Sequence, residues 1–367
     1  YRALILLVIS CPCALVVSVP LGYFGGVGAA AKSGLLVKGA EYLDRLLRTD
    51  TIVFDKTGTI TKGNFTVTEI VPRNGSSKNE LLKWAAAGEA QSSHPVAGAI
   101  RSAYSKQPVP AGTDAVVSEQ NISEYREHKG YGIVCKVDGS EVMAGSDRLM
   151  HREQIQHQDC DVEGTLVYVA VNRKYLGYIL IADEIKAEAK EAVQSLKVLG
   201  VQNVMMLTGD DQSAAKQVAR ETGIEHYYSR LLPEDKLRRI EMLKRRAEEQ
   251  DSVMFVGDGI NDAPVLTAAD VGVAMGGLGS DAAVEAADIV LMKDDLRALP
   301  TGIHIARYTR KIVLQNIIGA LGVKIVVLLL GVAGFASMWA AVFADVGVAL
   351  LAVGNSLRVI GAFRGPS

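Results

Sequence analysis

An apolar run without a single charged residue extends from Ala3 to Ala31 and constrains the fold more than any other feature of the chain. It is longer than the ~20 apolar residues with which a helix crosses a bilayer. Prolines at positions 12 and 20 and glycines at 22, 25, 26 and 28 lie inside the run, and they predict a broken or bent helix. Because non-helical backbone at membrane depth is tolerated where it faces protein or a cavity, we expect an ion site here.

Two cysteines, Cys11 and Cys13, flank Pro12 inside this run. Thiolates are soft ligands that favour ions such as Cu(I), Zn²⁺ and Cd²⁺, so the pair predicts a metal site within the membrane. The other two cysteines, Cys135 and Cys160, have no close ligand spacing. We interpret them as ordinary thiols of a reducing cytosol.

A second apolar block, residues 312–357, contains only two charged residues, Lys324 and Asp345. Glycines at 331 and 334 predict a turn that divides the block into two antiparallel spans. Lys324 lies 13 residues after the preceding charged residue, and Asp345 lies 13 residues before the following one. At a rise of 1.5 Å per residue, both are ~20 Å from the same membrane face. An ionisable pair at equal depth in a membrane predicts a functional site.

Basic residues mark the ends of the apolar segments: Lys32, Lys38, Arg307, Arg310, Lys311, Arg358 and Arg364. The positive-inside tendency places all of them on the cytosolic side. We therefore expect a multi-pass protein of the cell membrane whose residues 32–311 are cytosolic. The net charge of −2 and the lack of a basic motif give no indication of nucleic-acid binding.

Three short β-branched or apolar runs in the central region each end at an acidic motif. They are Thr51–Phe54 before Asp55, Val204–Leu207 before Thr208-Gly209-Asp210, and Ser252–Val256 before Gly257-Asp258-Gly259-Ile260-Asn261-Asp262. Helical patterns over residues 184–199 and 235–249 lie between the runs. Alternating strands and helices predict a doubly wound sheet whose ligands gather at the carboxyl ends of the strands. The residues expected to converge there are Asp55, Thr208, Asp210, Asp258 and Asp262.

These residue types suit phosphoryl transfer. Asp55 is the predicted nucleophile, because a carboxylate that attacks a terminal phosphoryl group forms an aspartyl phosphate. Asp258 is the predicted Mg²⁺ ligand, and Lys236 is the predicted phosphate-neutralising cation. Each element also has a structural alternative: a Gly-Asp-Gly turn, a hairpin at Asp-Lys-Thr-Gly-Thr, or a solvated helix residue at position 236. Three acidic strand ends in one chain favour the catalytic interpretation.

The joint motifs resemble those of P-type ATPases: Asp55-Lys56-Thr57-Gly58-Thr59-Ile60-Thr61, Thr208-Gly209-Asp210 and Gly257-Asp258-Gly259-Ile260-Asn261-Asp262. Cys11-Pro12-Cys13 and Ser93-His94-Pro95 resemble the heavy-metal-transporting branch. The resemblance covers essentially the whole chain, and it implies that ATP phosphorylates Asp55. The implied catalytic residues are Asp55, Lys56, Thr57, Thr208, Asp210, Lys236, Asp258, Asn261 and Asp262, of which Asp55, Thr57 and Asp258 would hold Mg²⁺.

The resemblance also implies a domain organisation. The fold would be α/β plus transmembrane α-helices: a haloacid-dehalogenase-like doubly wound phosphorylation domain, an inserted α+β nucleotide-binding domain and three membrane spans. The implied segments are 1–47 (first span and its cytosolic extension), 48–66 and 182–303 (phosphorylation domain), 67–181 (nucleotide-binding domain) and 304–367 (transmembrane hairpin).

Four residues of the insert match the family's ATP-binding positions: Glu89, His94, Gly130 and Gly132. Glycine lets the backbone approach a nucleotide closely, and an imidazole can contact adenine or orient phosphates. A histidine taken alone is more often structural, but the His-Pro context favours binding. The family's later Gly-Asn pair is Gly145-Ser146 here, a departure that weakens the expectation of a nucleotide contact at Ser146.

The last two spans indicate the metal class. Copper pumps of this family carry Tyr-Asn in the penultimate span and Met with Ser in the last, whereas this chain has Lys324 and Asp345. A carboxylate suits a divalent, borderline ion better than Cu(I), so the chain resembles the Zn²⁺/Cd²⁺/Pb²⁺ exporters. We hypothesise that Cys11, Cys13 and Asp345 bind the ion and that Lys324 is a countercharge, which pairs with Asp345 when the ion leaves. The alternative is a structural Lys–Asp ion pair, and Met338 is interpreted as packing.

Three other functions stay open at this point: a copper-class P-type ATPase, a membrane-tethered haloacid-dehalogenase-type phosphatase, and a non-catalytic metal-binding membrane protein. Such phosphatases usually carry a second Asp two residues after the nucleophile, where this chain has Thr57. A non-catalytic protein would leave the phosphoryl-transfer residues unexplained.

The family's actuator domain and earlier membrane spans do not occur in the sequence, which starts at Tyr1 rather than Met. We therefore expect them upstream in a longer, monomeric pump embedded in lipid. A signal peptide is not favoured, because the first apolar run is too long for one. By itself, the segment 1–367 is expected to undergo at most partial phosphorylation.

Overall fold

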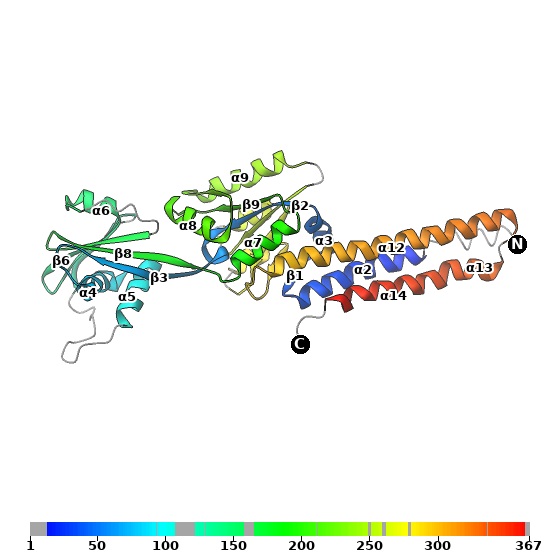
Figure 1. The fold of residues 1–367 in the computed structure, drawn as a ribbon, viewed down its shortest axis with the longest axis horizontal. Coiled ribbons are helices and arrows are strands. Elements are labelled where there is room, and N and C mark those ends of the chain that lie inside the picture. Colours follow the sequence, from blue (N-terminus) through cyan, green and yellow to red (C-terminus); the bar gives the residue numbers. More distant parts are fainter. Residues whose placement is uncertain are drawn as a thin grey trace.

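The computed structural model describes residues 13–92, 94–106, 122–128, 130–157, 165–210, 212–248, 251–258, 262–277, 280–335 and 337–363. Three units follow one another along the long axis of the molecule (Figure 1): a six-stranded sheet with helices, a seven-stranded sheet with helices, and a bundle of long helices. The fold class predicted from the sequence is confirmed in each of the three units.

The bundle consists of α2 (Cys13–Lys32), α12 (Ala298–Ala333), α13 (Met338–Val342), the π-type turn η5 (Phe343–Gly347) and α14 (Val348–Ala362). Within the described residues, three helical stretches are long and apolar enough to cross a membrane: Ala14–Lys32, Ala298–Ala333 and Met338–Ala362. Gly334 ends α12 with a φ of 86°, a conformation in which glycine often terminates a helix. The turn at this position therefore produces the predicted hairpin.

Helix α2 differs from the broken helix that the prolines and glycines predicted. It runs without interruption from Cys13 through Pro20 to Lys32. The glycines instead permit close packing: a Cβ atom on Gly22 would lie 2.8 Å from Cγ2 of Val313 in α12. Neighbouring helices and local adjustments let a membrane helix tolerate an internal proline. Pro12 lies outside the described residues.

The seven-stranded sheet is doubly wound. Its strands lie in the order β1, β13, β12, β11, β2, β9, β10, and every neighbouring pair is parallel except β1 with β13. Because both faces are covered by helices, the central strands are almost wholly buried. The strand bounds are β1 (Leu35–Val37), β2 (Thr49–Asp55), β9 (Asn203–Leu207), β10 (His226–Tyr228), β11 (Ser252–Gly257), β12 (Val271–Met275) and β13 (Ile289–Leu291).

Two groups of helices pack on opposite faces of this sheet. One face carries α3 (Ala40–Leu47), α7 (Ala189–Val198), α8 (Gln212–Thr222) and the start of α12; the other carries α9 (Pro233–Arg246), α10 (Ala263–Ala268) and α11 (Asp281–Ala286). The helix predicted over 184–199 begins at Ala189 instead, because Glu184 and Ile185 end the strand β8 (Lys174–Ile185). The helix predicted over 235–249 is α9.

The inserted sheet is antiparallel, in the order β3, β8, β7, β6, β5, β4. Its remaining strands are β3 (Thr61–Pro72), β4 (Ile122–His128), β5 (Gly132–Val137), β6 (Ser140–Gly145) and β7 (Thr165–Val171). Helices α4 (Lys78–Gly88) and α5 (Pro95–Ser105), joined through the short helix η2 (Glu89–Gln91), pack on one face, and α6 (Asp147–Arg152) packs on the other.

Strands β3 and β8 join the two sheet units (Figure 1), with pairing from Thr61–Ile185 to Pro72–Gly177. The predicted domain boundaries at 66/67 and 181/182 fall inside these paired strands. The boundary at 303/304 falls inside α12, which leaves the middle unit and enters the bundle as one helix. The boundaries therefore stay predictions.

Candidate functional site

Asp55 is the last residue of β2, at the centre of the seven-stranded sheet. The preceding Phe54 pairs with Val256 in β11 and with Met206 in β9. The loops that follow these three neighbouring parallel strands therefore open at the same edge of the sheet. The Asp55 side chain is 8% exposed, so a reacting group that reaches it is largely shielded from water.

Lys236 binds this carboxylate from helix α9. Its Nζ atom lies 2.5 Å from Oδ1 of Asp55 and 3.0 Å from Oδ1 of Asp262. Pro233 begins α9 only three residues earlier, so the first turn of the helix points the lysine at the strand ends. One cation therefore holds two buried carboxylates together.

A third carboxylate, Asp258, completes the cluster: one oxygen of each of Asp55, Asp258 and Asp262 lies within 4.8 Å of the others. Its approach depends on Gly58 in the turn η1 (Lys56–Ile60). A Cβ atom on Gly58 would lie 1.6 Å from Oδ2 of Asp258, and its φ of 73° also disfavours other residues. The glycine of the Asp-Lys-Thr-Gly-Thr motif thus makes room for the acid of the Gly-Asp-Gly motif.

The cluster is short of positive charge. Burial raises the pKa of Asp55 to about 7; Lys236 opposes that shift, and Asp262 adds to it. Burial also raises the pKa of Asp258 to about 6, with Asp262 contributing. For Lys236, attraction to Asp55 and Asp262 outweighs burial and raises the pKa, which keeps the ammonium charged. Three carboxylates around one ammonium form a site that favours a further cation.

The donor set fits Mg²⁺, which binds through carboxylate oxygens and retains several waters. The residues that would hold it are Asp55 and Asp258, with Thr57 beside them in η1. Bound Mg²⁺ would supply positive charge to the phosphoryl oxygens.

Lys56 points to a second group of acids next to the cluster. Its Nζ atom lies 2.6 Å from Oδ2 of Asp210 and 3.5 Å from Oδ2 of Asp183. Asp183 also accepts a 2.5 Å hydrogen bond from the Thr61 hydroxyl. A cavity of about 200 Å³ opens beside these residues, between the junction strands and α8. The group therefore ties the first turn after Asp55 to the strand that returns from the inserted unit.

The remaining predicted catalytic residues occupy different positions. Thr208 directly follows β9 and is buried, and its hydroxyl accepts a 3.1 Å hydrogen bond from the Asp210 amide. Thr57 is half-buried in η1. Asn261 lies outside the described residues.

Two buried charges near the site were missed in the sequence. Asp183 lies near the end of β8. Lys186 directly follows that strand, and its Nζ atom donates to the carbonyl oxygen of Gly58 over 3.1 Å. Burial lowers the pKa of Lys186. The segment Asp183-Glu184-Ile185-Lys186 repeats the pattern of an apolar strand that ends in charged residues. The helical pattern predicted over 184–199 includes three of these four residues and obscures that signal.

The four residues predicted to bind the nucleotide all lie in the inserted unit, two beside the helices α4 and α5 and two at the turn from β4 into β5. Glu89, in η2, is buried, and desolvation raises its pKa to about 7. His94 caps α5, where Nδ1 accepts a 3.3 Å hydrogen bond from the Val96 amide. Gly130 and Gly132 flank the turn into β5, with φ of 80° and 134°. A Cβ atom on Gly132 would lie 2.3 Å from the Ala144 carbonyl oxygen, so glycine is required there.

In the helix bundle, the Nζ atom of Lys324 lies 3.4 Å from Oδ1 of Asp345, and the two side chains are 11% and 13% exposed. Asp345 belongs to η5, a π-type turn of the kind that is frequent at functional sites. Cys11 lies outside the described residues, as does the side chain of Cys13. The next residue, Ala14, packs against Ala320 and Val348, which lie near the ion pair on α12 and α14.

A hydrogen-bond network in another part of the bundle, around Asn316, was not predicted from the sequence. Asn316 Nδ2 donates to the Ala352 carbonyl oxygen over 3.1 Å and to the Ser356 hydroxyl over 2.9 Å, and that hydroxyl donates to the Ser18 carbonyl oxygen over 3.1 Å. The network links α12, α14 and α2. A lone asparagine in an apolar run gives no signal of its partners.

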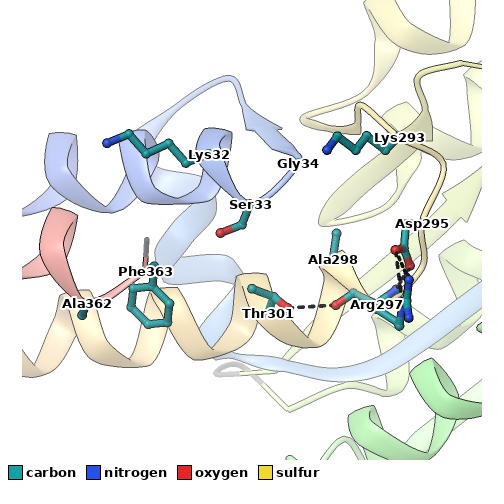
Figure 2. A pocket seen from close by; sticks show the side chains of 10 residues that line it. All are labelled: Lys32, Ser33, Gly34, Lys293, Asp295, Arg297, Ala298, Thr301, Ala362 and Phe363. Carbon is teal, nitrogen blue, oxygen red and sulfur yellow. Dashed lines mark hydrogen bonds and ion pairs between the residues drawn. The ribbon is translucent and has the colours of Figure 1, made fainter. Parts of the chain in front are cut away.

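A cavity of about 430 Å³ lies where α2, α12 and α14 meet the seven-stranded unit, and Figure 2 shows the side chains that line it. Arg297 at its edge is held by Asp295 at 2.8 Å, and its carbonyl oxygen accepts from the Thr301 hydroxyl. None of the carboxylates around Asp55 lines it. The lining residues are Lys32, Ser33, Gly34, Lys293, Asp295, Arg297, Ala298, Thr301, Ala362 and Phe363.

Comparison with known families and proteins gives a consistent result. Residues 49–270 match the haloacid dehalogenase-like hydrolase family. The chain is 53% identical to a zinc-transporting ATPase of Synechocystis over 98% of this chain and 48% of that protein. It is 54% identical to a cadmium, zinc and cobalt-transporting ATPase of Bacillus subtilis over 98% of this chain and 50% of that protein. The chain thus spans about half the length of these relatives.

Solved structures agree. A zinc-transporting PIB-type ATPase in the E2.Pi state superposes with a TM-score of 0.81 at 38% identity, over 98% of this chain and 58% of that one. The catalytic domain of the CPx-ATPase CopB-B, from a study of nucleotide binding, gives a TM-score of 0.58 at 31% identity, over 74% of this chain and 96% of that one.

Proposed function

The chain belongs to the metal-transporting P-type ATPases within the haloacid dehalogenase-like hydrolases, and from that membership we propose that it forms the catalytic and metal-releasing half of an ATP-driven exporter of Zn²⁺, Cd²⁺ or Pb²⁺. The observation that carries the proposal is the Lys236 ammonium bound to both Asp55 and Asp262, with Asp258 beside them. The names of the two relatives, a zinc and a cadmium, zinc and cobalt transporter, support the choice of a divalent ion.

The proposed chemical step is attack of Asp55 on the γ-phosphorus of ATP. Oδ1 is held by Lys236, so Oδ2 is the attacking atom. The new bond joins Oδ2 to phosphorus, and the bond between phosphorus and the β,γ-bridging oxygen breaks, with its electron pair leaving on ADP. Lys236 supplies fixed positive charge near the developing phosphoryl charge. Lys56, paired with Asp210 and Asp183, is proposed to hold the turn that follows Asp55.

The proposed ATP site is the inserted unit, where Glu89, His94, Gly130 and Gly132 match the family's motif. ATP bound there would need to reach Asp55 across the junction of β3 and β8. Mg²⁺ is the proposed cofactor, held at Asp55, Thr57 and Asp258.

The proposed metal site lies in the bundle, with Cys11, Cys13 and Asp345 as ligands and Lys324 as countercharge. The 3.4 Å pair of Lys324 and Asp345 supports this role, because an unpaired charge in a membrane is costly. We place the two sheet units on the cytosolic side of a cell membrane. The pump is proposed to act as a monomer, together with upstream segments of a longer protein.

The copper-class alternative is not favoured, because the relatives are named for zinc, cadmium and cobalt. A tethered phosphatase is not favoured either, since the chain has Thr57 where such enzymes use an acid.

The deciding experiment measures an acid-stable, hydroxylamine-sensitive phosphoenzyme from radiolabelled ATP in the full-length protein. We expect it in the wild type and not in Asp55→Asn. An equal phosphoenzyme in Asp55→Asn would overturn the nucleophile. ATPase activity against a panel of Zn²⁺, Cd²⁺, Pb²⁺, Co²⁺ and Cu(I) then tests the metal class, and stimulation by Cu(I) alone would overturn it.

A further inference from the structure

The inserted unit carries a cluster of metal-ligand side chains that the proposed pump mechanism does not use. Asp147 and His151 lie one turn apart on α6, and His157 follows in the next loop. One ligand atom from each lies within 4.8 Å of the others. Helix α6 packs on the face of the inserted sheet opposite α4 and α5, in the unit farthest from the bundle (Figure 1).

His157 is the fixed member of the cluster. Its side chain is 2% exposed, and the rings of Tyr168 and Tyr175 lie edge-on to it at 5.1 and 5.9 Å between centroids. Nδ1 lies 3.0 Å from the Ile155 carbonyl oxygen, and Nε2 lies 2.5 Å from Oδ1 of Asp147. Two ring contacts and two polar contacts therefore fix the orientation of the imidazole.

Both ring nitrogens of His157 thus face oxygen atoms that accept hydrogen bonds. A neutral imidazole has one N–H. If this N–H is on Nδ1 and donates to Ile155, the lone pair of Nε2 points at the Asp147 carboxylate, and a cation must separate them. At the present 2.5 Å a second proton meets this need, and a metal ion meets it once the Asp147 side chain, which is 45% exposed, moves back. A ring nitrogen that donates to a backbone carbonyl while the other faces outward is the usual arrangement of a metal-binding histidine.

His151 supplies the adjustable ligand. Its Nε2 atom lies 3.3 Å from Oδ2 of Asp147, and its side chain is 64% exposed. Two ligands bound at ~2.1 Å to one ion are at most ~4.2 Å apart. The Nε2 atom of His157 and Oδ1 of Asp147 are only 2.5 Å apart, whereas two tetrahedral ligands at ~2.1 Å from one ion are ~3.4 Å apart. Asp147 is 45% exposed, so rotation of Asp147 and His151 adapts the cluster to an ion without a change in the buried His157.

We propose that Asp147, His151 and His157 bind a divalent transition metal of the Zn²⁺ type in the inserted unit, separate from the membrane site. Two imidazoles and one carboxylate, with an open fourth position, suit Zn²⁺. The hard ions Ca²⁺ and Mg²⁺ prefer all-oxygen sites.

The metal would fasten α6 to the loop that holds His157. Ser146 is the residue before α6. Its amide and its hydroxyl both donate hydrogen bonds to the Tyr131 carbonyl oxygen, at 2.7 Å and 3.0 Å. Tyr131 stands between Gly130 and Gly132, the proposed nucleotide turn. Metal in the cluster would therefore change ATP affinity, a coupling that rests on the proposed nucleotide site.

The test uses chain 1–367 in detergent with Cys11→Ser, Cys13→Ser and Asp345→Asn, which together remove the proposed membrane site. Co²⁺ is the spectroscopic probe, and displacement by Zn²⁺ gives the affinity. In buffer with excess Mg²⁺, which fills the carboxylate site around Asp55, we expect one equivalent of Co²⁺ with the absorption bands of nitrogen and oxygen ligands. Binding should be at least tenfold weaker in His151→Ala and in His157→Ala. His226→Ala, which removes an exposed histidine of the middle unit, is expected to leave binding unchanged.

Three outcomes overturn the site: no Co²⁺ binding in the starting protein, a spectrum of thiolate ligation only, or equal affinity in His151→Ala. Because His151 is exposed, that variant decides the matter even if His157→Ala does not fold. The measurement uses neither ATP nor the membrane site, so it can succeed when the pump proposal fails. ATP affinity with and without Zn²⁺ is then compared between the starting protein and His151→Ala, where the difference should vanish.

Discussion

Lys324 and Asp345, 21 residues apart in the chain, face each other across 3.4 Å between α12 and the turn η5. Each is the partner that makes the burial of the other tolerable in an apolar surrounding. A purely structural pair would be equally sensitive to loss of either member, whereas a metal ligand and its countercharge would not.

We therefore expect Asp345→Ala in the full-length protein to lower zinc-stimulated ATPase activity at least tenfold, a loss of about 1.4 kcal/mol or more. Lys324→Ala should still bind Zn²⁺, because it removes the competitor and not the ligand. The measurements are ATPase activity and equilibrium zinc binding. Val346→Ala, at a half-exposed neighbour, serves as the control. Equal loss of zinc binding in the two charge variants would identify a structural pair.

Lys236→Met removes the cation between Asp55 and Asp262. The pKa of Asp55, already raised to about 7 by burial, should rise further, so fewer molecules carry the carboxylate nucleophile at neutral pH. We expect phosphoenzyme formation to fall about 100-fold, the loss typical of a removed electrostatic group. The remaining activity should increase with pH over a higher range than in the wild type. Arg238→Met, at an exposed position of the same helix, should retain the wild-type profile, and a Lys236→Met profile that peaks at the wild-type pH would contradict the assignment.

Gly58→Ala should abolish phosphoenzyme formation, because its Cβ atom would lie 1.6 Å from Oδ2 of Asp258. Gly75→Ala is the matched control: its φ of 82° is similarly unfavourable, but nothing lies within 4 Å of the added atom. That variant is expected to cost only about 1 kcal/mol of local stability and to be phosphorylated normally. Phosphorylation and thermal unfolding are measured on both, and normal phosphorylation of Gly58→Ala would show that the contact is dispensable.

Glu89→Gln should make the inserted unit more resistant to high pH. Desolvation raises the pKa of Glu89 from 4.5 to about 7. A raised pKa stabilises the fold below pH 4.5, and this contribution is lost as pH rises through 7. The difference in local unfolding free energy between variant and wild type should therefore grow by about 3 kcal/mol over that interval. Native-state hydrogen exchange of β5 amides measures it, with Glu80→Gln as an exposed control; a pH-independent difference would be incompatible with a buried, titrating Glu89.

Much of the fold was predictable because the period of the apolar residues differs between its parts. The long uncharged runs required helices of membrane length, and the acidic ends of three β-branched or apolar runs located the edge where Asp55, Asp258 and Asp262 meet. The glycines at 22 and 26 do not break the helix as the sequence predicts, because α12 packs closely against them. Packing of Gly26 against Thr309, 2.6 Å from an added Cβ atom, is a tertiary constraint.

Other parts depended on partners far away in the chain. Asp183 and Lys186 lie more than 120 residues after the turn they contact, and no local pattern pairs them with it. The link of Asn316 to Ser356 and Ser18 joins three helices and becomes visible only when the helices are assembled. The cluster of His151 and His157 likewise needed the fold, because the spacing of six residues between them matches no common ligand motif.

Helix α12 extends for 36 residues from the seven-stranded unit to the hairpin turn, which makes it ~54 Å long. Thr309, wedged against Gly26, lies ~16 Å from one end at Ala298 and ~22 Å from Lys324. The first turns of the helix, as far as Ala306, are packed into the core of the seven-stranded unit, so the anchored segment and Lys324 belong to one continuous rod. A tilt of the anchored segment would therefore displace the lysine sideways, in proportion to the ~22 Å of helix that separates it from Thr309.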